Sequence, residues 1–196
     1  PKKIWHEPPQ RPAGDISVGI MGLGSLGRAA ASVLLSLGFS VKGWSRSDRP
    51  MEGVSTYAGE AGLIPFLKAT DILVVLLPLT PTTQGIINYG VLKELRKRNG
   101  LGGSVLINAG RGRLQKDADI LRALEDGTLK EASLDVFEVE PLPKTSPIWG
   151  HPKVFVTPHS AATSDPVHLA PTMLRQMAAF ERGETLHNLV DRDAGY

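Results

Sequence analysis

Three ionisable side chains follow stretches of sequence that are typical of buried strands. Arg111, Glu140 and His159 each lie a few residues past such a stretch. A guanidinium binds a carboxylate through two hydrogen bonds and polarises an adjacent carbonyl group. A histidine beside a carboxylate retains its proton more readily and can act as a general acid. The three residue types predict a site that binds a carboxylate and protonates a carbonyl oxygen.

Each of these residues also has a structural interpretation. Arg111 would then be a surface cation, Glu140 a loop carboxylate and His159 a histidine near a turn. Their shared placement after strands of one sheet favours the catalytic interpretation. The other histidines lack this context and are expected to be structural or exposed: His6, His151, His168 and His187.

A glycine turn follows the apolar run from Ile16 to Met21. Gly22, Gly24 and Gly27 have the Gly-x-Gly-x-x-Gly spacing, and apolar residues at helical spacing follow them as far as Gly38. The first glycine allows a tight turn, the second lets the backbone approach a pyrophosphate, and the third permits close helix–strand packing. The helix N-terminus then faces the anion. The turn predicts dinucleotide binding, and the alternative is a glycine-rich turn without a ligand.

The end of the second strand-like run indicates which dinucleotide. NAD-binding units carry an Asp or Glu there for the ribose hydroxyls. This chain has Ser45, Arg46 and Ser47 instead. Arg46 can pair with a 2′-phosphate, and the two serines can add hydroxyl donors. We expect NADP to be preferred. The alternative is a solvated loop arginine, which Asp48 could engage.

Strand-like and helix-like segments alternate along the chain. Such alternation predicts an α/β fold, a doubly wound parallel sheet with helices on both faces and ligands beyond the carboxyl ends of the strands. The expected strands are 17–21, 40–44, 72–77, 104–108, 131–136 and 153–156, and the expected helices are 25–37, 60–69, 89–98 and 117–125. Asp165 is expected to cap a last helix that ends near Gly183, with Leu169, Met173, Met177 and Phe180 on its apolar face.

Composition limits the remaining classes of protein. The 196 residues are 41% hydrophobic and contain no cysteine, which excludes disulfides and thiolate metal sites. The longest apolar run, from Ile72 to Leu77, is too short to cross a bilayer. No targeting pattern opens the sequence, so a cytoplasmic location is expected. We expect neither a metal nor a membrane partner.

The net charge of +2 and the pI near 9.0 raise the question of nucleic acid binding. The cations are scattered except for Lys93, Arg96, Lys97 and Arg98. Cations at a helix C-terminus offset its dipole. We therefore expect this cluster to end a helix, and we expect no nucleic acid partner.

Several motifs together resemble those of the D-isomer-specific 2-hydroxyacid dehydrogenase family. They are Gly22 to Gly27, Leu76 to Thr83, Asn108 to Gly112, Asp135 to Leu142 and Thr157 to Ala161. The Trp44 to Ser47 stretch and the ending from Val190 to Tyr196 look most like the NADPH-dependent glyoxylate/hydroxypyruvate reductases of that family.

The resemblance implies NADPH-dependent reduction of a small 2-oxo acid to the D-2-hydroxy acid. Arg111 would orient the substrate, His159 would protonate the carbonyl oxygen, and Glu140 would keep His159 protonated. Asp135 would bind the nicotinamide carboxamide. The residues expected at the cofactor are Gly22, Gly24, Ser25, Leu26, Gly27, Ser45, Arg46, Ser47, Leu77, Pro78, Thr83, Ala109, Gly110, Asp135 and Ala161.

The resemblance also sets the expected domain organisation. Residues 1–14, rich in proline between 7 and 14, would be a connector or remnant of a substrate domain, 15–162 the NADP-binding domain, and 163–196 a C-terminal helix and tail. Family members carry a substrate domain ahead of the nucleotide domain. We therefore expect a truncated form that binds NADPH with little turnover. We also expect it to form a homodimer. The alternatives are a dinucleotide-sensing corepressor-like protein and a bare nucleotide-binding module.

Overall fold

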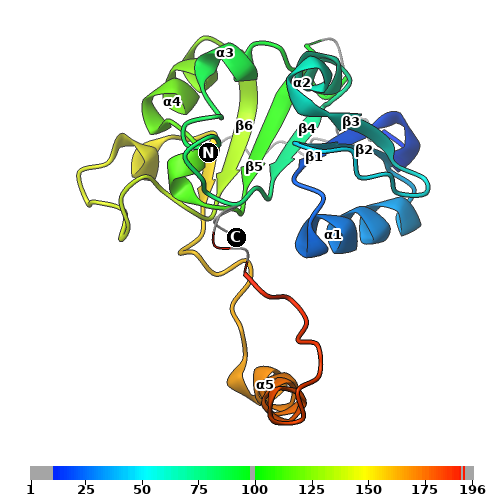
Figure 1. The fold of residues 1–196 in the computed structure, drawn as a ribbon. Coiled ribbons are helices and arrows are strands. Elements are labelled where there is room, and N and C mark those ends of the chain that lie inside the picture. Colours follow the sequence, from blue (N-terminus) through cyan, green and yellow to red (C-terminus); the bar gives the residue numbers. More distant parts are fainter. Residues whose placement is uncertain (1–10, 98–99, 191, 193–196) are drawn as a thin grey trace.

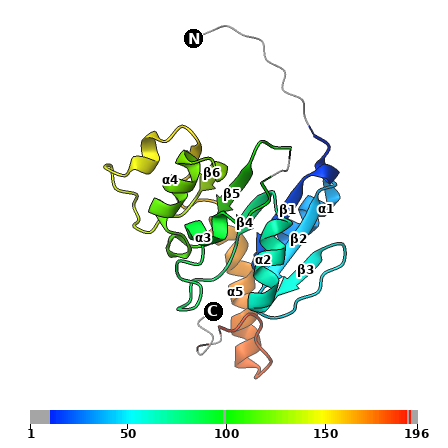
Figure 2. The ribbon, with the colours of Figure 1, turned by 90° about the horizontal axis from the view of Figure 1, so that it is seen from above.

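A seven-stranded parallel sheet forms the centre of the fold. The computed structural model describes residues 11–97, 100–190 and 192. The strands lie in the order β3-β2-β1-β4-β5-β6-β7, and every pair of neighbours is parallel. Helices pack against the sheet, as Figures 1 and 2 show. The predicted doubly wound α/β fold is confirmed.

The elements follow the predicted alternation closely. The strands are β1 (Ser17–Met21), β2 (Ser40–Ser45), β3 (Ser55–Ala58), β4 (Ile72–Val75), β5 (Ser104–Asn108), β6 (Leu129–Leu134) and β7 (Val154–Val156). The α-helices are α1 (Ser25–Ser36), α2 (Gly59–Lys68), α3 (Tyr89–Leu92), α4 (Asp117–Glu125) and α5 (Pro166–Glu181). Three short 3₁₀ turns complete the described part: Ala13–Asp15, Gly112–Leu114 and Pro147–Gly150.

Two clusters of buried side chains lie on opposite faces of the sheet. Helices α2, α3 and α4 contribute Phe66, Leu92 and Ile120 to the larger cluster. Helix α1 contributes Ala31 to the smaller one, which also holds Ile20 and Leu23. Side chains of a strand alternate between faces, so β1 supplies Ile20 to one cluster and Met21 to the other. Helices can thus cover both faces of the sheet because successive residues of a strand are apolar and point to opposite faces.

Helix α1 forms as predicted, but its apolar residues divide between two faces. Gly27 and Ala31 are buried, and Leu34 packs on the same side against the smaller cluster. Leu26, Val33 and Leu37, which the apolar spacing also included, are 51–62% exposed. Small residues face the sheet because the helix approaches the strands closely. Gly38 follows with a positive φ of 85°, as expected for a residue that ends a helix.

Two predictions of local structure were wrong. Strand β3 was not expected, because Ser55–Ala58 is short and only its pairing with β2 makes it a strand. The helix expected over 89–98 ends at Leu92. After it the chain turns back to the sheet, and the Arg96 amide donates to the Thr70 carbonyl. A tertiary contact has overridden the helical pattern here.

Arg96 therefore does not offset a helix dipole as expected. Its guanidinium makes two hydrogen bonds, of 2.6 and 2.8 Å, to the buried carboxylate of Asp71. The same carboxylate accepts a 2.8 Å bond from the Ser17 amide at the start of β1. Asp71 thus joins the amino ends of β1 and β4 to the turn after α3. Arg98 of the same cluster lies outside the described residues.

Helix α5 stands apart from the layered body, joined to it by the chain on either side (Figure 1). Asp165 caps it as predicted, since its side chain accepts a hydrogen bond from the Val167 amide. Its expected apolar face is exposed: Leu169, Met173, Met177 and Phe180 are 44–71% exposed. Within the described ranges, no helix is both long and apolar enough to span a bilayer.

Replacing Arg96 tests the role of the Asp71 contact. We expect Arg96→Ala to lower the free energy of unfolding by about 2 kcal/mol, because it leaves a buried carboxylate without its cation, discounted for the partial exposure of Arg96. Chemical denaturation measures the change. Arg182→Ala, which breaks an exposed pair with Glu184, is the control and should change nothing measurable. Equal effects of the two variants would contradict this role.

Candidate functional site: a pocket at the carboxyl edge of the sheet

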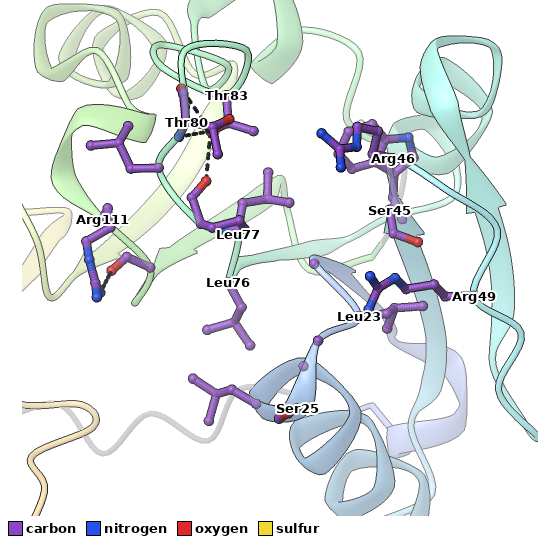
Figure 3. A pocket seen from close by; sticks show the side chains of 18 of the residues that line it. Leu23, Ser25, Ser45, Arg46, Arg49, Leu76, Leu77, Thr80, Thr83 and Arg111 are labelled. Atoms are coloured by element: carbon purple, nitrogen blue, oxygen red, sulfur yellow. Dashed lines mark hydrogen bonds between the residues drawn. The ribbon is translucent and has the colours of Figure 1, made fainter. Parts of the chain in front are cut away.

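A pocket of about 640 Å³ opens where the central strands end. Segments that follow β1, β2, β4 and β5 line it, and Val190 of the C-terminal tail reaches it as well. Figure 3 shows Ser45, Arg46 and Arg49 on one side of the pocket, and Leu77, Thr80, Thr83 and Arg111 on the other. The volume lies within the range of about 300–1,000 Å³ typical of small-molecule sites.

The glycine turn forms one wall of the pocket. Gly22 has a φ of 108°, and a Cβ there would lie 2.7 Å from the Leu76 carbonyl oxygen. At Gly27 a Cβ would lie 1.9 Å from the Gly22 carbonyl oxygen, whereas at Gly24 it would meet nothing within 4 Å. The first and third glycines are therefore required by packing, and the second leaves open space in front of the backbone.

The N-terminus of α1 faces this open space. Gly24 is its N-cap, and within the described part of the chain no side chain caps the free amides of the first turn. Ser25 and Leu26 line the pocket beside it. Unpaired amides and the positive end of a twelve-residue helix attract an anion. This wall is chemically suited to a phosphate or pyrophosphate.

Cationic and hydroxyl groups gather where β2 ends. Ser45 is buried, and its hydroxyl donates a 2.8 Å hydrogen bond to the Ser47 carbonyl. Arg46 and Arg49 line the pocket on either side of Ser45 in Figure 3. Among the described residues that line the pocket there is neither an Asp nor a Glu. The local charge therefore favours an anionic group.

The segment after β4 forms the opposite wall. Leu76 and Leu77 leave the sheet and continue into a turn that the Thr83 hydroxyl organises. That hydroxyl donates to the Pro78 carbonyl at 2.7 Å and accepts from the Thr80 amide at 2.8 Å. The turn from Pro78 to Thr83 is thus held by hydrogen bonds within the segment.

Arg111 lies at the far end of the pocket from Arg46. It follows β5 and is exposed, and its Nη1 donates a 2.8 Å hydrogen bond to the Gly110 carbonyl. Hydrogen bonds hold the loop that carries it, because the Asn108 carboxamide accepts from the Gly110 amide and donates to the Gln115 side chain. A Cβ on Gly112 would overlap the Phe137 carbonyl, so this loop also packs directly on the segment after β6.

His159 and Glu140 form the predicted pair. The imidazole Nδ1 lies 2.8 Å from Oε2 of Glu140, and the Phe137 amide donates to the other carboxylate oxygen at 2.9 Å. Burial raises the pKa of Glu140, but the hydrogen bonds from His159 and Phe137 outweigh it and hold the pKa below its usual value. Glu140 is therefore an anion at neutral pH, and its carboxylate fixes the orientation of the imidazole through the contact with Nδ1.

Asp135 lies at the end of β6 with only 5% of its surface exposed. Its carboxylate accepts hydrogen bonds from the Thr157 hydroxyl and from the amides of Ser160 and Ala161. Burial would raise the pKa of Asp135, but these bonds outweigh it and lower the pKa. The carboxylate is thus an ionised acceptor surrounded by donors of the loop after β7.

The structure brings most of the predicted residues together in two groups. Arg111 lies in the pocket with thirteen of the predicted cofactor residues: Gly22, Gly24, Ser25, Leu26, Gly27, Ser45, Arg46, Ser47, Leu77, Pro78, Thr83, Ala109 and Gly110. Asp135, Glu140, His159 and Ala161 form a second group after β6 and β7, linked by hydrogen bonds and outside the lining of the pocket. Arg111 is not bonded to Glu140 or His159 among the described residues.

Sequence reasoning missed several residues of the pocket. Arg49 lies beyond the motif that singled out Arg46, although a second cation so near was a usable signal. Trp44 and Leu23 line the pocket from the ends of β2 and β1. Val190 belongs to a tail whose approach to the pocket no local pattern indicates. Most of the tail motif from Val190 to Tyr196 lies outside the described residues.

Comparison with known proteins supplies independent information. Residues 2–161 match the model of the family described as "D-isomer specific 2-hydroxyacid dehydrogenase, NAD binding domain". A curated relative, glyoxylate/hydroxypyruvate reductase A of Citrobacter koseri, is 43% identical over 195 residues, which is all of this chain and 61% of that protein. The protein of the same name from Salmonella paratyphi B is 42% identical over 193 residues.

Solved structures agree with these relatives. An NADPH-dependent glyoxylate/hydroxypyruvate reductase from Sinorhizobium meliloti, in complex with NADP and sulfate, is 52% identical with a TM-score of 0.95. A probable 2-hydroxyacid dehydrogenase from Rhizobium etli, in complex with NADP, HEPES and L(+)-tartaric acid, is 49% identical with a TM-score of 0.93. Each match covers 98% of this chain and 60% of the other. The chain thus spans about 60% of the length of these relatives.

Substitutions in the glycine turn test whether Gly27 is required for the packing of α1 on β1. We expect Gly27→Ala to lower the free energy of unfolding by about 2–3 kcal/mol, because the new methyl group must displace α1 from the end of β1. Gly24→Ala, at a site with open space, is the matched control and should cost less than about 1 kcal/mol. Thermal and denaturant unfolding measure both, and similar losses would contradict the packing role of Gly27.

Proposed function

Because this chain belongs to the D-isomer specific 2-hydroxyacid dehydrogenase family, we propose that it binds NADP(H) in the pocket and serves the reduction of a small 2-oxo acid. The main observation behind this proposal is the order in which cationic and anion-binding groups lie along the pocket. Arg46 and Arg49 lie at one end, the bare N-terminus of α1 in the middle, and Arg111 at the other end. The proposed substrates are glyoxylate and hydroxypyruvate, after the names of the relatives.

The residues of the pocket fit an NADP molecule. The open space at Gly24 and the free amides of α1 suit the pyrophosphate. Arg46 and Arg49 would hold the 2′-phosphate, since guanidinium groups bind phosphate through paired hydrogen bonds, whereas the Ser45 hydroxyl already donates to the Ser47 carbonyl. Leu77, Pro78 and Ala109 would line the nicotinamide end. Two structures that this chain resembles contain NADP, which supports the same choice of cofactor.

When bound, the reduced nicotinamide supplies a hydride for the carbonyl carbon of the substrate. Arg111 would bind the substrate carboxylate and polarise the carbonyl beside it. His159 would donate a proton to the carbonyl oxygen, which makes the product a 2-hydroxy acid. Glu140, ionised and bonded to Nδ1, would hold the imidazole in its protonated form and orient it.

We further propose that residues 15–162 form the NADP-binding domain and that 163–196 form a separate C-terminal helix and tail. The exposed apolar side chains of α5 support this division, because the described part of the body provides them with no cover. The same exposed face supports assembly into a homodimer.

Two measurements on this chain test the function. Fluorescence titration with NADPH measures binding, and the decrease in NADPH absorbance with glyoxylate or hydroxypyruvate measures reduction. Binding with substrate-dependent oxidation supports the whole proposal. Binding without any oxidation would restrict the chain to a nucleotide-binding role, and the absence of NADPH binding would contradict the proposed use of the pocket.

Cofactor preference depends on Arg46 in this proposal. We expect NADPH to bind more tightly than NADH, and Arg46→Gln to weaken NADPH binding by roughly 10- to 100-fold, the range for losing a charge-assisted contact. NADH affinity should change by less than about threefold, because NADH has no 2′-phosphate. Arg113→Gln removes an exposed arginine outside the pocket lining and is the control. Tighter binding of NADH by the unaltered chain would contradict the proposal.

Proton transfer depends on His159. We expect His159→Gln to lower substrate-dependent NADPH oxidation by at least about 100-fold, because glutamine has no proton to donate. Its dissociation constant for NADPH should change by less than about twofold, since His159 lies outside the pocket lining. His168→Gln, at an exposed histidine on α5, is the control and should leave the rate unchanged. A loss of NADPH binding in His159→Gln would refute the assigned role.

A further inference from the structure

We propose that the side chains of Asp135 and Thr157 form a clasp that fixes the backbone around His159 and so directs its imidazole toward Glu140. Both would be positioning residues that act through His159. Their importance for reduction rests on the proposed function, whereas the clasp itself is a property of the folded chain. This role differs from the contact with a nicotinamide carboxamide expected for Asp135.

Four hydrogen bonds tie Asp135 to the loop after β7. Its carbonyl accepts from the His159 amide at 2.8 Å. One carboxylate oxygen accepts from the Thr157 hydroxyl at 2.5 Å and from the Ser160 amide at 2.9 Å. The other accepts from the Ala161 amide at 3.0 Å. The donors come from both sides of His159 in the sequence, so the histidine is held between them.

The backbone of His159 explains why the loop needs this support. Its φ is 53°, in the left-handed region that residues other than glycine rarely adopt. This conformation turns the chain so that the two following amides point back at one carboxylate. Successive amides around a left-handed residue form a concave site for an anion, and Asp135 supplies that anion from within the chain. The side chain of His159 then leaves the loop on the side of Glu140.

The charges near the imidazole are those of Glu140 and Asp135. Glu140 contacts Nδ1 directly, whereas the carboxylate of Asp135 bonds to the two backbone amides that follow His159. Hydrogen bonding keeps Asp135 ionised, so it accepts from all of its donors at once. An asparagine could not do so, because its NH₂ group would face one of the amides.

Nuclear magnetic resonance of this chain tests the clasp without cofactor or substrate. The readouts are hydrogen exchange of the Ser160 and Ala161 amides and the His159 Nδ1 proton signal that marks the bond to Glu140. We expect Thr157→Val to speed exchange of the Ser160 amide by about tenfold or more and to weaken the Nδ1 signal. Asp135→Asn should affect both amides. Thr157→Ser, which restores a hydroxyl, should resemble the unaltered chain.

Thr163→Val is the matched control. Thr163 lies in the same loop and donates to the Ser160 carbonyl, but it does not contact Asp135. Loss of the Thr163 hydroxyl should leave the His159 Nδ1 signal unchanged. The clasp would be overturned if Thr157→Val kept both the exchange protection and the Nδ1 signal, or if Thr163→Val had the same effect. Thr157 is exposed, so its substitution reports on the clasp even where Asp135→Asn fails to fold.

The outcome is distinguishable from failure of the proposed function. If the variants show the expected resonance changes but the unaltered chain does not oxidise NADPH, the clasp is supported and only the proposed reduction is contradicted. If the unaltered chain oxidises NADPH but Thr157→Val changes neither amide exchange nor the Nδ1 signal, the proposed function is supported and the clasp is contradicted.

Discussion

The close approach of α1 to the end of β1 is the constraint on which the pocket depends. Gly27 lies so near the Gly22 carbonyl that no side chain fits between them. The helix therefore begins directly at the sheet edge, with its first amides open in front of Gly24. Because all seven strands are parallel, the loops after β2, β4 and β5 end at this same edge. Anion-binding groups from distant parts of the sequence thus share one pocket.

Backbone amides and side chains have different roles in the two parts of the site. At the glycine turn the backbone amides face the pocket, and the side chains are absent. Beyond β6 and β7 the arrangement is reversed, because the carboxylate of Asp135 occupies the amides of the loop and leaves the His159 side chain to interact with Glu140. Backbone amides are therefore open to an anion from outside the chain at the glycine turn, and they bind the carboxylate of Asp135 in the loop after β7.

Local patterns in the sequence were sufficient for the fold and for most of the pocket. Glycine spacing, apolar alternation and residues at strand ends each have a direct physical cause, and α4 was predicted with its observed bounds. Strand β3 and the turn at Arg96 were missed because their causes are contacts with residues distant in sequence, β2 and Asp71. The donors around Asp135 were missed for the same reason, since three of the four are backbone amides.

The pocket joins segments from Gly22 to Val190, and this breadth couples binding to the stability of the chain. A ligand that contacts the folded pocket and not the unfolded chain raises the free energy of unfolding by RT ln(1 + [L]/Kd). Each tenfold excess of free ligand over its dissociation constant therefore adds about 1.4 kcal/mol. The ratio of the free ligand concentration in the cell to its dissociation constant thus sets how much of the chain escapes unfolding and proteolysis, independently of any reaction in the pocket.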